Sequence, residues 1–137
     1  MREFWNAIQF CFTALGGWLG YFLGGYDGVL YALIVFVVLD YITGLMRAIV
    51  DKEVSSETGF RGIFKKVVIF MLVGVANILD VHVLGQGAVL RTAIIFFELS
   101  NEGISLLENA AYLGVPIPEP LKNVLQQLHD RDGKKQG

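Results

Sequence analysis

The sequence predicts an all-α membrane protein with four transmembrane helices and a short C-terminal amphipathic helix. Hydrophobic residues make up 54% of the 137 residues and charged residues only 18%, which is unusual for a soluble domain. Four apolar stretches, at about residues 4–25, 28–50, 67–84 and 88–114, each approach the roughly 20 residues that a helix needs to cross the hydrocarbon core. We therefore expect a transmembrane domain over residues 1–116 and a cytoplasmic amphipathic helix with a disordered tail over residues 117–137.

The first stretch also fits a cleaved signal peptide, but only Arg2 supplies positive charge before it. The apolar part of a signal peptide rarely contains residues such as Asn6, Gln9 and the two tryptophans found here. We therefore expect a retained helix. The second stretch is the strongest, because "GVLYALIVFVVL" carries no charge before Asp40. The third, "VVIFMLVGVANILDVHVL", is clear but short.

The fourth stretch either spans the membrane or lies flat at its surface, because its uninterrupted apolar run ends at Glu98. Flat interfacial helices usually carry Lys and Arg toward anionic lipid, so an acidic face favours the spanning interpretation. After "PIPEP" at 116–120, apolar residues recur at i, i+3, i+4 and i+7, which predicts the short amphipathic helix. These residues are Leu121, Val124, Leu125 and Leu128.

The distribution of basic residues predicts the orientation. The polar stretch from Asp51 to Lys66 is basic, whereas the connectors at 24–28 and 82–87 contain no Lys or Arg. Its basic residues are Lys52, Arg61, Lys65 and Lys66. By the positive-inside rule this stretch is a cytoplasmic loop, and four crossings then place both termini in the cytoplasm. The basic residues of the tail agree, namely Lys122, Arg131, Lys134 and Lys135.

Polar residues share faces on all four predicted helices, as expected when they recur at helical spacing. On the fourth helix the polar stripe is Arg91, Glu98, Asn101, Glu102, Ser105, Glu108 and Asn109. The second helix carries Asp40, Thr43 and Arg47, the third carries Asn77 and Asp80, and the first carries Asn6, Gln9, Thr13, Gly16, Gly20 and Gly24. A charge at the bilayer centre costs at least about 2.5 to 3.5 kcal/mol. These faces must therefore meet each other, a neighbouring subunit or a water-filled lumen.

Two interpretations stay open for each face. Asp40 and Arg47 can pair with adjacent helices of the same chain, and Arg47 can also extend to the membrane surface. The glycine repeat permits close helix approach within one subunit or between subunits. One four-helix unit is too narrow to enclose a solute-wide lumen, so a pore requires a homo-oligomer. We favour the fourth helix as its lining, with the first helix as the competitor.

The segment "LDYITGLMRAIVDKEVSSETGFRGIFKK", at 39–66, resembles phage lysis and toxin-secretion holins of clostridial and related Gram-positive prophages. The resemblance continues through "ANILD" at 76–80 and "ELSNEGISLLENAAYLGVPIPEPL" at 98–121. It implies a protein of the bacterial cytoplasmic membrane that self-associates and opens lesions, through which an endolysin or a large toxin leaves. It implies no catalytic residue and no cofactor.

Other classes of protein fit the sequence less well. A small proton-coupled exporter of four helices is one alternative, and an antiholin that regulates such a pore is another. An enzyme is not expected, because no phosphate loop, partnered nucleophile or metal cluster is present. Cys11 is the single cysteine, and the net charge of -2 with no dense basic tract gives no indication of a nucleic-acid partner.

Overall fold

The structure, a computed structural model, describes residues 1–85, 87–124, 126 and 127. This part of the chain forms helices joined by short connectors and contains no strand, which confirms the all-α prediction at this level. In chain order the elements are α1 (Arg2–Leu23), α2 (Gly28–Val50), α3 (Ser56–Ile78), η1 (Leu79–Leu84) and α4 (Val89–Tyr112). Each of the four apolar stretches is thus helical. The π-helical η1 continues α3 without a break.

The third helix begins at Ser56, well before the start predicted at about residue 67. Ser55 caps it by accepting a hydrogen bond from the backbone N–H of Thr58, at 3.2 Å. The connector between α2 and α3 therefore shrinks to residues 51–55, and Arg61, Lys65 and Lys66 lie on a helix rather than in a loop. The hydropathy pattern located the apolar part of this helix, whereas the cap and the polar first turns decide where the helix begins.

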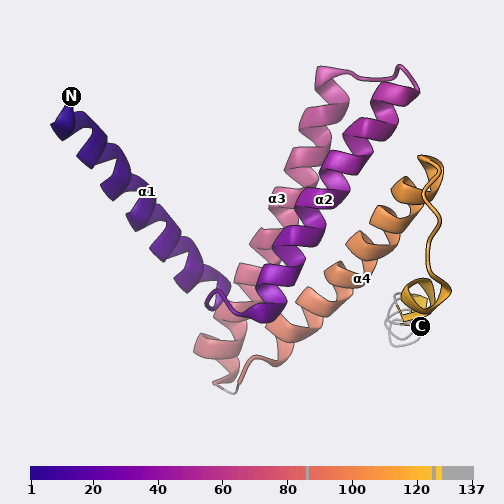
Figure 1. The fold of residues 1–137 in the computed structure, drawn as a ribbon. Helices are drawn as coiled ribbons and strands as arrows, with labels where there is room; N and C mark the ends of the chain where they lie inside the picture. Colours follow the sequence, from indigo (N-terminus) through magenta and orange to yellow (C-terminus); the bar gives the residue numbers. More distant parts are fainter. Residues whose placement is uncertain (86, 125, 128–137) are drawn as a thin grey trace.

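A tight turn joins α1 to α2. Gly24 ends α1 with a φ of +89°, a left-handed conformation that glycine adopts without a side-chain clash. Asp27 then caps α2 by accepting a hydrogen bond from the N–H of Leu30, at 3.0 Å. The two helices consequently run in opposite directions from one end of the molecule (Figure 1).

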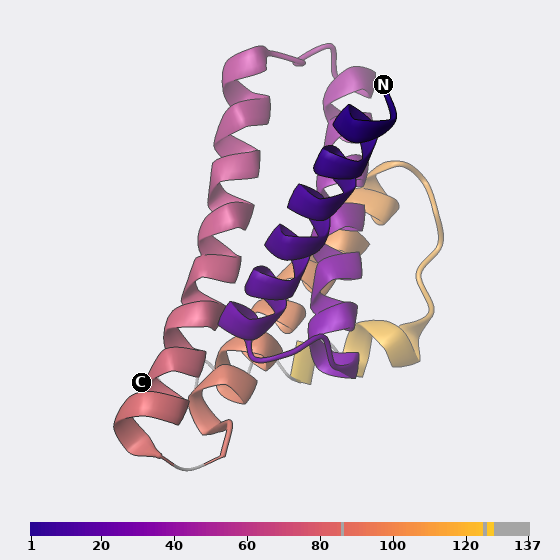
Figure 2. The ribbon, with the colours of Figure 1, turned by 90° about the vertical axis from the view of Figure 1, so that its left-hand side faces the viewer.

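The helices α2, α3 and α4 form the packed body of the structure, and α2 and α4 make the most extensive contact. Its core contains Leu30, Leu33, Val73 and Ile95, all completely buried. The helix α1 diverges from this body on the side away from α4 and touches α3 near one end only (Figures 1 and 2). At that end the ring of Phe22 occupies the space above Gly74, where an added Cβ would lie 2.0 Å from it.

Large apolar side chains cover much of the outer surface, including most of α1. Among the described residues, α2 and the continuous helix Ser56–Leu84 are long and apolar enough to cross a membrane. The exposed apolar surface and these two helices agree with a membrane protein. Four crossings stay a prediction.

Beyond α4 the chain turns back at Gly114, whose φ is +94°, and residues 119–124 form part of a short helix (Figure 1). Leu121 and Val124 are exposed on it. The other two apolar residues of the predicted amphipathic helix, Leu125 and Leu128, lie outside the described residues, as do the basic residues Arg131, Lys134 and Lys135.

Candidate polar cluster and cleft

A polar cluster joins the three packed helices about halfway along α2. It consists of Asp40 and Thr43 from α2, Lys66 from α3, and Glu102 and Asn109 from α4. The ammonium group of Lys66 lies 2.7 Å from Asp40 Oδ2 and 2.8 Å from Glu102 Oε2. Two carboxylates thus share one cation. A cation in contact with both carboxylates offsets much of their mutual repulsion.

Asn109 completes the cluster from the next turns of α4. Its Nδ2 donates to Asp40 Oδ1 at 3.1 Å and to Thr43 Oγ1 at 3.0 Å. Asp40, Glu102 and Asn109 are each buried, with exposed fractions of 7 to 9%. Burying such groups is tolerated only when they are paired and hydrogen-bonded, as they are here. The cluster therefore ties α2, α3 and α4 together through directional contacts.

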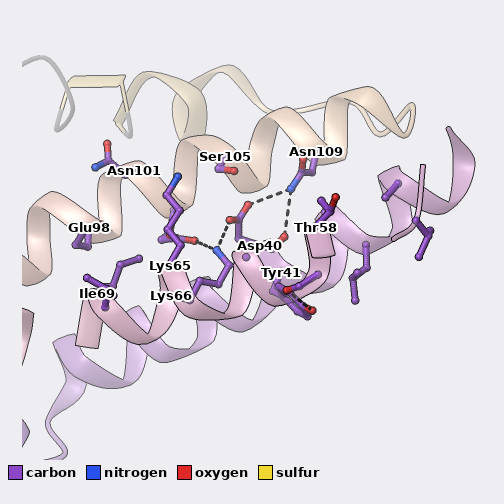
Figure 3. Close-up of a pocket in the computed structure, with 18 of the residues that line it drawn as sticks. Asp40, Tyr41, Thr58, Lys65, Lys66, Ile69, Glu98, Asn101, Ser105 and Asn109 are labelled. Atoms are coloured by element: carbon purple, nitrogen blue, oxygen red, sulfur yellow. Dashed lines mark hydrogen bonds and ion pairs between the residues drawn. The ribbon is translucent and has the colours of Figure 1, made fainter. Parts of the chain in front are cut away.

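A cleft of about 650 Å³ opens beside the cluster, between α3 and α4, with α2 as its floor (Figure 3). Of the stripe predicted on the fourth helix, Glu98, Asn101, Glu102, Ser105 and Asn109 line this cleft. Glu108, by contrast, is exposed elsewhere on α4. Lys65 and Lys66 contribute from α3, and Glu53 lies at the end near the connector between α2 and α3. The cleft is thus a polar feature set into predominantly apolar helices.

Arg91 lies at the other end of α4, away from the cleft, with an exposed fraction of 3%. Its guanidinium contacts both carboxylate oxygens of Asp27, at 2.8 and 3.2 Å. It also donates to the carbonyl oxygens of Leu23, at 2.5 Å, and Gly25, at 3.0 Å. The hydrogen bond from Arg91 holds the pKa of Asp27 below its usual range. Within one chain, Arg91 therefore fastens the turn between α1 and α2 to the start of α4.

Two polar residues of the third apolar stretch reinforce this end. The carboxylate of Asp80, which is 1% exposed, accepts from the backbone N–H groups of Leu90 and Arg91, at 3.0 and 2.9 Å. It satisfies donors at the start of α4 that have no partner within the helix. Asn77 donates to the carbonyl oxygen of Phe22, at 3.1 Å. Both residues were predicted as intramembrane partners, and in the chain they contact backbone groups.

Of the three glycines predicted for helix packing, Gly16 and Gly20 lie in the second half of α1, and Gly24 follows its last residue. Tyr26 donates a hydrogen bond to the carbonyl oxygen of Gly16, at 2.6 Å, and its ring lies against Gly20. A Cβ at Gly24 would lie 2.6 Å from Arg91 Nε. Within the chain, Gly20 thus makes room for the ring of Tyr26, and Gly24 makes room for Arg91 of α4.

At the opposite end, α2 and α4 are linked outside the polar cluster. The guanidinium carbon of Arg47 lies 4.0 Å from the centre of the Tyr112 ring, and the Tyr112 hydroxyl donates to Asp51. Such an arrangement is a cation–π contact. Arg47 was predicted to pair with a neighbouring helix or to extend to the membrane surface, and here it stacks on α4.

The sequence interpretation missed the role of Lys66, which it assigned to a basic cytoplasmic loop. A signal was available, because Lys66 precedes the buried Ile69 and Val73 at helical spacing and so extends the buried face of α3. It also missed Asp27 and Tyr112. No group of three His, Cys, Asp or Glu side chains able to hold a metal ion occurs in the part of the chain that the structure describes.

Comparison with known proteins places these features in a family. The profile of the bacteriophage holin family matches residues 17–130. An uncharacterised 14.9 kDa protein of Clostridium perfringens is 43% identical over 96% of this chain and 99% of its own length. An uncharacterised protein of Listeria monocytogenes is 38% identical over 91% of this chain and 96% of its own length.

A named relative comes from a phage. The probable holin of Bacillus phage phi105 is 33% identical over 75% of this chain and 76% of its own length. No solved structure matches the chain. The match to the family profile covers most of the sequence, including all five residues of the polar cluster. The chain therefore belongs to the bacteriophage holin family, a family of membrane proteins.

Proposed function

We propose that this protein is a holin whose copies assemble in the bacterial cytoplasmic membrane and open a lesion that releases an endolysin or a large toxin. The observation that carries the proposal is the buried polar cluster with the adjoining cleft, both set among apolar helices. Ionised groups at membrane depth are costly and usually mark a pathway or a pairing site. Here Glu98 and Glu102 lie along one side of α4, and Lys66 of α3 pairs Glu102 with Asp40 of α2.

The proposed topology has four crossings with both termini in the cytoplasm. Successive helices run in opposite directions, which supports it, because the start of α1, the 51–55 connector and the end of α4 then lie toward the same side (Figure 1). Arg2, Lys52 and Arg61 belong to that side. At the other side Arg91 is paired with Asp27 and so adds little free positive charge. The positive-inside rule therefore favours this orientation.

In the proposed mechanism, a dilute chain keeps its polar groups paired internally. When copies gather, the side of α4 that carries Glu98, Asn101 and Ser105 meets polar groups of a neighbouring copy or water, and the apolar surfaces remain against lipid and neighbouring subunits. These new contacts then replace part of the pairing that Lys66 provides to Asp40 and Glu102. Assembly thus depends on the lateral concentration of the protein.

Co-expression with a cytoplasmic endolysin tests this function. We expect the culture to lyse only when both proteins are present, and purified protein in liposomes to release a large dextran. A small proton-coupled exporter would pass small solutes and retain the dextran. An antiholin would protect cells that express another holin. Either of these outcomes would contradict the proposal.

A further inference from the structure

The helix α1 carries side-chain amides that have no partner among the residues that the structure describes. Asn6 and Gln9 are exposed, and no described residue forms a hydrogen bond with their side chains. Thr13, on the same face, donates a hydrogen bond to the backbone carbonyl oxygen of Gln9. In the proposed topology this face lies in hydrocarbon, where an amide without a hydrogen bond costs several kcal/mol. The amide face of α1, meaning Asn6, Gln9 and Thr13, therefore needs a polar partner.

The cleft between α3 and α4 offers polar groups with which such amides can form hydrogen bonds. Its walls carry carboxylate, amide and hydroxyl groups, with Glu98 and Ser105 among them, and it is open along one side. Lipid tails cannot form hydrogen bonds with these groups. A helix with amide groups can supply both donors and acceptors to them.

The α1 helix of the same chain cannot fill this cleft. It leaves the body on the side away from α4 (Figures 1 and 2). The C-terminal end of α1 is fixed there by hydrogen bonds. Arg91 donates to the carbonyl oxygens of Leu23 and Gly25, and Asn77 donates to the carbonyl oxygen of Phe22. The occupant must therefore come from another chain.

The two features lie at similar distances along their helices. At 1.5 Å per residue, Gln9 is about 21 Å from the Leu23 end of α1, and Ser105 is about 24 Å from the Val89 end of α4. Both ends belong to the same side of the membrane in the proposed topology. At the other end of α1 lies Arg2, and Glu53, an acidic residue that lines the cleft, lies just beyond the end of α2. A parallel placement of a neighbouring α1 thus pairs amides with polar groups and an arginine with a glutamate.

We propose that the amide face of α1 from one copy docks into the cleft between α3 and α4 of the next copy. This contact rests on the proposed self-assembly and identifies the surfaces that carry it. Because the two surfaces differ, the contact is head to tail, and repetition gives a ring or an open chain. Each copy inserts its α1 into one neighbour and receives the α1 of the other neighbour. Every cleft within a closed ring is therefore filled.

Disulfide trapping between two differently tagged chains tests the docking in membranes. One chain carries Gln9→Cys with Cys11→Ala, and the other carries Ser105→Cys with Cys11→Ala. We expect mild oxidation to give a mixed dimer of the two chains. The matched control is the unmodified chain, since Cys11 is exposed and lies about 200° around α1 from Gln9. That chain should form little mixed dimer with the Ser105→Cys chain.

Two results would overturn the docking. One is equal trapping from Gln9→Cys and from Cys11. The other is a single chain with both Gln9→Cys and Ser105→Cys that closes an internal disulfide, which would place α1 in its own cleft. The dextran assay is independent of this result. Release of dextran without specific trapping rejects the docking alone, whereas specific trapping without release rejects the holin function alone.

A second variant tests the contact without cysteine. Gln9→Met keeps the length of the side chain and removes its amide, so we expect about tenfold weaker self-association in detergent micelles, as for the loss of one or two hydrogen bonds. Phe4→Met, on the opposite face of α1, is the control and should leave association unchanged. Helix content by circular dichroism confirms that both variants fold. Equal association of Gln9→Met and the unmodified protein would reject the docking.

Discussion

Replacing Lys66 with methionine should weaken the structure strongly, because Lys66 is the shared cation of Asp40 and Glu102. Its Nζ lies 2.7 and 2.8 Å from their oxygens, and the three side chains are only 9 to 16% exposed. At such separations each attraction is about 6 kcal/mol for an effective dielectric constant of about 20, and the desolvation of the charges offsets most of it. Without Lys66, two buried carboxylates face each other. We expect a loss of about 3 to 5 kcal/mol in the free energy of unfolding.

The assay is equilibrium unfolding in mixed micelles, followed by circular dichroism as a denaturing detergent is added. Lys65→Met is the matched control, since Lys65 is the exposed neighbour and should change stability by less than about 0.5 kcal/mol. Replacing all three charges, as Asp40→Asn, Lys66→Met and Glu102→Gln, should recover much of the loss, because no unpaired charge then remains. Equal unfolding midpoints for Lys66→Met and Lys65→Met would refute the cluster as a link between the helices.

Three further predictions concern the end of the molecule where α1 meets α2. Arg91→Lys should lower the free energy of unfolding by about 1 to 3 kcal/mol in the same assay, because one ammonium cannot reproduce all the hydrogen bonds that the guanidinium makes with Asp27 and with the carbonyl oxygens of Leu23 and Gly25. Arg91 holds the pKa of Asp27 below its ordinary value of 3.8, so the contribution of the ionised carboxylate is complete above pH 3.8 and is lost as the pH falls through the lowered value. Asp27→Asn should remove that part of the acid dependence in a pH series of unfolding curves. Gly74→Ala should cost about 1 to 3 kcal/mol by displacing the ring of Phe22, and Phe22→Ala in the same chain should make the glycine change nearly neutral in a double-mutant cycle.

The limits of the sequence interpretation follow from particular residues. Arg91 shares a helical face with Glu98, so the pattern grouped them in one stripe. In the folded chain Arg91 bonds the turn between α1 and α2, whereas Glu98 lines the cleft. Helical periodicity gives the direction of a side chain around its axis, but the residue it meets depends on what packs at that height. A stripe along a helix of this length can therefore serve different contacts at its two ends.

Lys66 was assigned to the wrong element. A count of basic residues assigned it to a cytoplasmic loop, because the positive-inside rule treats each cation by its position in the sequence. The early start of α3 instead places Lys66 one turn before the buried Ile69, on the face toward α2 and α4. Recognising the cap at Ser55 would have extended the helix and brought Lys66 onto that face.

The sequence by itself determined the helical class, the apolar segments and the faces on which polar residues gather, because hydropathy and helical periodicity are properties of neighbouring residues. Only the tertiary structure decided which polar groups meet. The cluster of Asp40, Lys66 and Glu102 draws one residue from each of three helices, so it depends on how these helices pack. The divergence of α1 likewise depends on contacts between distant residues, chiefly Arg91 with the α1–α2 turn and Phe22 with Gly74.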